Sequence, residues 1–254
     1  MKKGVQVLVA TMNQNDHSLI DKMKITSDAI IGNQCDRNEI EQFMYNGKRV
    51  VYLSFAERGV GLNRNNTLMR ADTEYCIFAD DDMFYLDGYE ERIISAFENN
   101  PKADVIVFNL KENIPTRYVI TKTHQVRFWN FGRYGAARIA IRLESIRNNA
   151  IYFNQCYGGG TEHCHGEDNL FLCDCLKAGL KIYAIPDILA CLTDERQSTW
   201  NNGYGEKYLH DQGDLYKAIS KRLWKLLCLQ DVFRHKKTYG IPFRLAYKTM
   251  IGKK

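Results

Sequence analysis

Three consecutive aspartates, Asp80, Asp81 and Asp82, close a short apolar run. Adjacent carboxylates repel one another, and a buried strand behind them makes that repulsion more costly. Hard divalent cations such as Mg²⁺ and Mn²⁺ prefer carboxylate oxygens, and Mg²⁺ is commonly held by one or two carboxylates together with substrate phosphates. In extended backbone Asp80 and Asp82 point to the same side, so we expect these two to share a cation. The alternative is a solvated acidic turn.

A second pair of acids, Glu167 and Asp168, follows three glycines at Gly158–Gly160 and directly precedes a helical pattern. Acids at the start of a helix offset its dipole, and Asp is a good N-cap residue, so a structural role is one interpretation. Capping alone does not explain the glycine-rich approach, which allows backbone to lie close to a ligand. This segment is therefore a second candidate site.

The elements that must position these acids can be predicted from the pattern of apolar residues. Five short apolar runs predict strands at residues 5–11, 28–34, 49–54, 75–79 and 103–110. Helical composition or periodicity lies between them, at residues 18–25, 61–71 and 89–101. Strands that alternate with helices in this way predict an α/β fold with a mostly parallel sheet.

Polar residues follow several of these strands. Thr11 and Asn13 follow the first strand, Asp36 follows the second, and the three aspartates follow the fourth. Ligands of open α/β sheets bind beyond the carboxyl ends of the strands, so we expect these groups to meet at one sheet edge.

After residue 111 the alternation loosens into extended segments with long connections, which predicts an extension of the sheet. Order returns with a helix predicted over residues 168–178, ended by Gly179, and a strand over residues 180–185 that stops before Pro186.

Five segments occur in a familiar order: VLVATMNQ, NQCD, ERGVGLNRNNTLMRA, CIFADDDM and GGGTEHCHGEDNLF. Together they resemble bacterial family 2 glycosyltransferases of the GT-A fold, over about residues 5–216. The resemblance implies a Rossmann-like, mostly parallel central sheet flanked by helices, with a C-terminal helical extension. It divides the chain into a GT-A domain (1–216), with a nucleotide-sugar donor half (1–111) and an acceptor and catalytic half (112–216), and a basic helical tail (217–254).

The resemblance also assigns roles. Asp80 and Asp82 are expected to hold Mn²⁺ or Mg²⁺ and the donor diphosphate, with Asp81 assisting. Asp168 is expected to be the general base, with Glu167 as the second choice. The remaining donor-site residues are expected to be Thr11, Asn13, Asp36 (on the uracil ring), Gly61 and Arg64 (near the diphosphate). The alternatives are structural: Arg64 pairs with surface acids of its helix, and Asp36 caps a turn.

We expect an inverting, metal-dependent transfer from a nucleotide-diphosphate sugar, a UDP-sugar, to a saccharide or lipid-linked saccharide in cell-surface polysaccharide synthesis. A sugar nucleotidyltransferase is the rival enzyme. It requires a glycine-rich basic loop after the first strand, and TMNQNDHS has neither glycine nor basic residue. A nucleotide-sugar binding module without turnover is the rival of another class, and it has no use for Asp168.

Aromatic residues of the segment 194–213 suit sugar stacking or a lid, and an ordinary surface loop is the alternative. The predicted acceptor and lid residues are Gly159, Gly160, Trp200, Tyr204 and His210, the last as an extra metal or phosphate contact.

The charge of the chain is uneven. The net charge is +5, but residues 217–254 contain eleven Lys or Arg and a single acid, so the rest of the chain is acidic. Apolar residues at 215, 219, 223, 226 and 227 share one helical face with basic residues largely away from it. Such a helix favours contact with an anionic membrane surface, and packing on the domain is the alternative. Nucleic acid is not expected, because no binding motif accompanies the charge.

Eight cysteines and six histidines raise the question of zinc. The one cluster is His163, Cys164, His165, Cys173 and Cys175, but Cys173 and Cys175 point apart on a helix, so a tetrahedral site is not expected. The apolar run near the N-terminus is too short for a signal peptide, and reduced buried thiols fit a cytoplasmic protein, with the tail on the inner face of the membrane.

Overall fold

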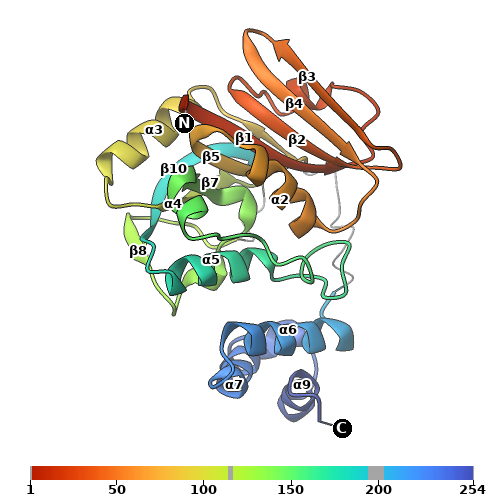
Figure 1. The fold of residues 1–254 in the computed structure, drawn as a ribbon. Coiled ribbons are helices and arrows are strands. Elements are labelled where there is room, and N and C mark those ends of the chain that lie inside the picture. Colours follow the sequence, from red (N-terminus) through yellow and green to blue (C-terminus); the bar gives the residue numbers. More distant parts are fainter. Residues whose placement is uncertain (1, 114–116, 194–202, 254) are drawn as a thin grey trace.

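The computed structural model describes residues 2–113, 117–193 and 203–253. Within these residues the strands form one ten-stranded sheet with helices packed on it, and the last helices form a separate layer beyond α5 (Figure 1). The predicted α/β architecture is confirmed.

The strands lie in the order β3-β4-β2-β1-β5-β9-β7-β10-β6, and β8 pairs with β10. The central strands β4, β2, β1 and β5 run parallel, while β9 runs antiparallel between β5 and β7. The parallel order brings the carboxyl ends of β1, β2 and β5 to one edge of the sheet. The strands are β1 (Lys2–Met12), β2 (Asp28–Gln34), β3 (Glu39–Tyr45), β4 (Lys48–Phe55), β5 (Thr73–Asp80), β6 (Met83–Tyr85), β7 (Val105–Lys111), β8 (His124–Val126), β9 (Ile139–Arg142) and β10 (Ile182–Leu192).

The described helices cover both faces of this sheet and build the C-terminal layer. They are α1 (Leu19–Lys22), α2 (Val60–Arg70), α3 (Tyr89–Asn99), the short turns η1 (Phe131–Arg133) and η2 (Ala136–Arg138), α4 (Leu143–Asn148), α5 (Glu167–Lys177), α6 (Glu206–Ile219), α7 (Trp224–Arg234), α8 (Lys236–Tyr239) and α9 (Phe243–Met250).

Alternating residues of the central strand enter different cores. Val7 and Val9 belong to the cluster that includes Phe97 of α3. Leu8 belongs to the cluster on the other face, which includes Phe171 of α5 and residues of α2 and α4. Because side chains alternate along a strand, a segment buried on both faces is apolar at successive positions, as β1 is from Val7 to Ala10.

Several strands were not predicted from the sequence. The antiparallel edge strand β3 mixes polar and apolar residues and is half exposed, so it carries no long apolar run. β6, β8 and β9 have only three or four residues each. The prediction that a strand stops before Pro186 was wrong, because β10 continues to Leu192. Its pairing with β7 shifts register between Ala184 and Ile188, so the ladder needs no N–H from the proline there.

The helices α6, α7 and α9 pack around a core of their own, which includes Leu209, Val232 and Met250. We call residues 206–253 the helical unit. The sequence boundary expected after residue 216 falls inside α6, and the expected basic helix is divided, because α6 ends at Ile219 and α7 begins at Trp224.

The helical unit rests on the α/β domain through a small apolar joint of Tyr157, Leu170 and Leu215. Gly166, just before α5, lies so close to Leu215 that a Cβ at position 166 would meet its side chain at 2.8 Å. Across the described ranges, no helix combines the length and apolar character that crossing a bilayer requires.

Candidate active site

Arg64 lies at the centre of the site and joins the two acidic motifs. Its guanidinium donates to Asp80 Oδ1 at 2.6 Å and to Glu167 Oε1 at 2.7 Å. The side chain is buried and lies over the ring of Phe153, 5.4 Å from the ring centroid. Burial alone would lower the pKa of Arg64, but the charges of Asp80 and Glu167 outweigh it and raise the pKa above its usual value. The arginine is therefore a permanent positive charge between two carboxylates.

The position of Arg64 is set by its helix. The neighbouring Asn65 donates to the carbonyl of Phe153 at 2.9 Å and accepts from the N–H of Phe153 at 2.8 Å. This pair of bonds fastens α2 to the loop that leads toward α5. Gly61 serves the same contact, because a Cβ there would lie 2.6 Å from the carbonyl oxygen of Asn154.

The three aspartates lie where β5 ends, and each has a different environment. Asp80 pairs with Arg64, and Asp81 accepts a hydrogen bond of 2.5 Å from the Thr11 hydroxyl at the end of β1. Burial, followed by the charges of Asp80 and Asp81, raises the pKa of Asp82 to about 6. The carboxyl ends of β1 and β5 thus meet as the sequence predicts.

The end of β2 joins the same edge through Asn33. Its amide donates to the carbonyl of Gln14 at 3.0 Å, and its Oδ1 accepts from the N–H of Gln14 at 3.0 Å. Asn13 and Asp36 are exposed in the two loops that follow β1 and β2. The structure places both at the predicted edge, with their side chains directed to solvent-accessible space.

The chemistry of the aspartates fits a hard divalent cation. The negative charges of Asp80 and Asp81 repel the carboxylate of Asp82, and a bound cation would offset that repulsion. Two carboxylates with substrate phosphates form a usual Mg²⁺ set, so Asp80 and Asp82 are the residues that would hold Mn²⁺ or Mg²⁺.

A different group of candidate metal ligands occurs beside α6. Among the described residues, one set of three brings its ligand atoms within 4.8 Å of one another: Cys164, His165 and Asp211. Asp211 already accepts hydrogen bonds from the N–H of Cys164 and from Lys207, at 2.9 and 3.0 Å. Cys173 and Cys175 lie on α5, are fully buried in the domain core and are not among these three residues.

Asp168 is the second residue of α5 and lies next to the Arg64 cluster. Its Oδ1 accepts a hydrogen bond of 2.6 Å from the N–H of Asn169. Burial, followed by the charge of Glu167, raises the pKa of Asp168 to about 7, although Arg64 and the Asn169 N–H oppose that shift. A carboxylate of this pKa is matched to accepting a proton near neutral pH.

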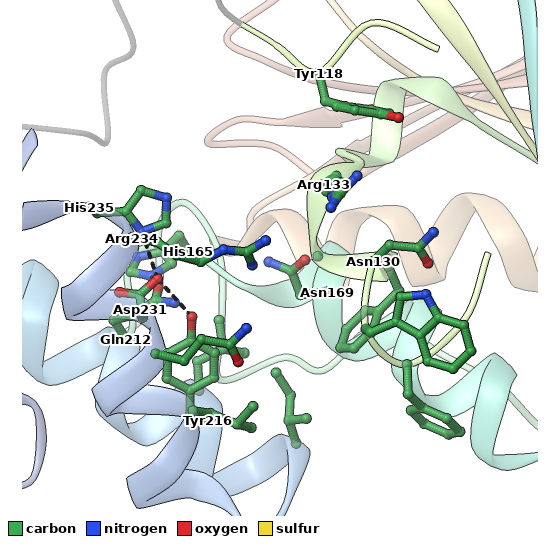
Figure 2. Close-up of a pocket in the computed structure, with 18 of the residues that line it drawn as sticks. Tyr118, Asn130, Arg133, His165, Asn169, Gln212, Tyr216, Asp231, Arg234 and His235 are labelled. Carbon is green, nitrogen blue, oxygen red and sulfur yellow. Dashed lines mark hydrogen bonds and ion pairs between the residues drawn. The ribbon is translucent and has the colours of Figure 1, made fainter. Parts of the chain in front are cut away.

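A large cavity opens beside Asp168, between the domain and the helical unit. It has a volume of about 1190 Å³ and is lined by Asn169 of α5, by the loop before η2, and by α6 and α7 (Figure 2). A Cβ on Gly135, in that loop, would lie 3.5 Å from Asp168 Oδ2. The predicted base therefore borders a space large enough for a sugar acceptor.

Sequence reasoning missed most of the cavity wall. Asn169 was not singled out, although its Oδ1 is a buried acceptor without a hydrogen-bond partner among the described residues. Trp129, Arg133 and Arg234 also line the cavity. The aromatic segment 128–134, which contains Arg133, was the available signal, but nothing in its spacing tied it to α5.

The predicted acceptor and lid residues do not all lie at the cavity. Tyr204 lines the cavity, and Gly159 holds α2 by accepting a hydrogen bond of 2.9 Å from Val60. Gly160 adopts a positive φ of 82° in the same loop. His210 is half exposed, with Glu206 at 4.0 Å, and does not line the cavity. Trp200 lies outside the described residues.

A comparison with protein families gives one match. The profile described as Glycosyl transferase family 2 matches residues 33–161, which span half of the chain and include β5, the aspartates and Arg64. The chain belongs to glycosyl transferase family 2. It is therefore a glycosyltransferase, as the sequence motifs indicated.

Solved structures show the fold of this family 2 enzyme. It is similar to S. aureus TarS residues 1–349 in complex with UDP-GlcNAc, with a TM-score of 0.63, 15% identity, and coverage of 100% of this chain and 93% of that one. The same TarS fragment with UDP gives a TM-score of 0.61, 17% identity, and coverage of 100% and 92%. The predicted GT-A fold is confirmed. A sequence comparison with curated proteins gives no match.

Proposed function

We propose that this family 2 enzyme transfers a sugar from a UDP-sugar, with inversion at the anomeric carbon, to a hydroxyl group of a saccharide or lipid-linked saccharide in cell-surface polysaccharide synthesis. The observation that carries the proposal is the position of Asp168, between the Arg64 cluster and the large cavity. The TarS structures with UDP-GlcNAc and UDP support a nucleotide-sugar donor for this fold.

The donor half of the site is built from the sheet edge. Thr11, Asp81 and Asp36 line the loops where a nucleotide would lie, and Arg64 supplies a fixed positive charge near its diphosphate. Asp80 and Asp82 would hold Mn²⁺ or Mg²⁺, which when bound offsets the negative charge that develops on the departing diphosphate.

Asp168 acts on the acceptor side. Its carboxylate takes the proton of the acceptor hydroxyl as that oxygen forms its bond to the anomeric carbon, and the bond from that carbon to the diphosphate oxygen breaks with its electron pair leaving on UDP. A hydroxyl alone is a poor nucleophile, so the reaction needs a base. Inversion requires the acceptor oxygen, and therefore the base, to lie on the side opposite the leaving group. Glu167 is committed to Arg64 and therefore orients the arginine.

The test is Asp168→Asn, which keeps the size of the side chain and removes its basicity. We expect UDP binding in the presence of Mn²⁺ to be retained and transfer to fall by about a hundredfold or more, measured by calorimetry and by release of UDP. The matched control is Asp174→Asn on the exposed side of the same helix, where the carboxylate pairs with Lys177. Unchanged transfer by Asp168→Asn would remove this residue from the role of base.

The helical unit supports a membrane contact. Leu226, Leu229 and Phe233 of α7 are exposed, Phe233 by 78%, and they recur at helical spacing. Exposed basic residues flank them in the sequence, including Lys225 and Lys237. An exposed apolar stripe among basic residues fits the headgroup region of an anionic bilayer, so we place α7 against that surface.

A further inference from the structure

The charges that line the large cavity are mostly positive. Arg117, Arg133 and Arg234 line it, together with His165 and His235. Arg117 forms an ion pair with Glu112, whereas Arg133 lies over the ring of Tyr118, 4.8 Å from the centroid, and pairs with no acid among the described residues. Arg234 of α7 likewise has no acidic partner in the described part of the chain. Among the residues that the structure describes, these two guanidinium groups thus line the cavity without an acidic partner.

Among the described residues, one acid lines the cavity, and its carboxylate already accepts hydrogen bonds from neighbouring side chains. Asp231 accepts hydrogen bonds from Tyr216 and from His235, both at 2.9 Å, and from the hydroxyl of Tyr239 (Figure 2). These donors occupy its carboxylate inside the helical unit, and within the described residues it forms no ion pair with Arg133 or Arg234.

The same cavity offers aromatic surfaces on which sugar rings could pack. It also contains a buried hydrogen-bond acceptor atom that has no partner among the described residues. Trp129 and Phe128 line it and are exposed by 77% and 55%. Asn169 presents its buried Oδ1 beside Asp168, where an acceptor hydroxyl could donate to it. Figure 2 shows Arg234 on the helical unit and Arg133 on η1, the two walls between which Asn169 lies.

We propose that the acceptor is an anionic saccharide that carries a phosphate group, held by Arg133 and Arg234, while its sugar packs near Trp129 and presents a hydroxyl to Asp168. This assignment rests on the proposed transferase function and names its substrate class. A planar guanidinium binds phosphate through two parallel hydrogen bonds, and opposed arginines bind it more selectively than lysines would.

The probe is glucose 1-phosphate, compared with the uncharged methyl α-glucoside, on protein saturated with UDP and Mg²⁺ so that phosphate contacts of the donor site are filled. We expect ligand-observed NMR to give about tenfold tighter binding of the phosphorylated sugar. The double variant Arg133→Gln/Arg234→Gln should remove this difference.

The matched control is Arg222→Gln/Arg244→Gln, which removes two exposed arginines of the helical unit that do not line the cavity. This control should keep the preference for the phosphorylated sugar. Equal binding of the two sugars by the unaltered protein, or an equal loss in the control, overturns the proposal. UDP binding is measured on the same samples, so failure of the donor assignment is seen separately.

A second arm identifies the source of the phosphate, using inorganic pyrophosphate and geranyl diphosphate under the same conditions. Apolar residues Leu223 and Leu227 line the α7 side of the cavity. Tighter binding of geranyl diphosphate assigns the phosphate to a lipid carrier, and equal binding assigns it to the saccharide chain. If the Arg133→Gln/Arg234→Gln variant keeps its affinity for both compounds, these arginines do not form a phosphate site.

Discussion

Arg64 brings together carboxylates that the sequence separates widely, since Asp80 is 16 residues away and Glu167 is 103 residues away. The positive charge of Arg64 offsets the negative charges of Asp80 and Glu167 only in part, so both acids still raise the pKa of Asp168. Burial and the remaining negative charge raise the pKa of Asp168 to about 7. The ionisation of this one carboxyl group should therefore limit activity near neutral pH.

The transfer rate should rise with pH through about 7 and level off above it. Only the deprotonated carboxylate accepts a proton, and the raised pKa of Asp168 places that deprotonation near neutrality. The measurement is kcat/KM between pH 5 and 9 with saturating Mn²⁺.

Glu167→Gln should move this acid limb to lower pH, because the charge of Glu167 raises the pKa of Asp168. Asp174→Asn, on the same helix, should leave the limb in place. An acid limb near pH 4 in the unaltered enzyme would contradict a base in this environment.

Residue types and strand positions were sufficient to propose the acids of the candidate site. Asp80, Asp82 and Asp168 follow recognisable patterns within one segment each. The partners of Arg64 were not predictable in the same way, because they depend on how α2 packs against the loop before α5. Arg133 and Asn169 were missed for the same reason: their proximity is created by the loop 131–135 folding over α5.

At the scale of elements, α6 and α9 pack closely against each other at Gly213. A Cβ at Gly213 would lie 1.8 Å from the carbonyl oxygen of Met250, so α9 reaches the backbone of α6. Gly213→Ala must separate the two helices, which should cost about 1–3 kcal/mol.

We expect Gly213→Ala to lower the Tm in thermal melts by about 3–10 °C for a chain of this size. The control is Gly205→Ala at the start of α6, where φ is −73° and a Cβ meets nothing within 4 Å. Equal Tm values for the two variants would show that α6 and α9 do not pack this closely.

The strands that were predicted correctly are the buried ones. β2 was predicted at its observed bounds because every residue from Ala29 to Gln34 is buried. The edge strand β3 and the short antiparallel strand β9 depend on partners elsewhere in the sheet, and their own sequences carry weak patterns. The break between α6 and α7 follows the packing of the helical unit, while the sequence there keeps a helical spacing.

At the scale of the whole molecule, the helical unit and the edge strand β3 lie at opposite ends (Figure 1). This separation provides a test of the membrane contact. Leu226→Ser/Phe233→Ser should weaken sedimentation with phosphatidylglycerol vesicles by about tenfold, because two apolar side chains no longer enter the bilayer.

The control for this test is Ile40→Ser/Met44→Ser, which removes two equally exposed apolar residues from β3. It should leave vesicle binding unchanged. Equal binding to phosphatidylcholine vesicles, or no effect of the α7 variant, would argue against an anionic membrane surface as the partner of α7.

The contact between Leu215 and Gly166 has a consequence for exchanging parts between related enzymes. Gly166 has a φ of 108° and precedes Glu167 and Asp168 directly, so whatever fills the space of Leu215 also sets where α5 begins. A chimaera that receives its last helices from another family member should inherit that member's choice of acceptor while keeping its own donor. It should remain active only if the grafted segment places a side chain of leucine's volume against this glycine.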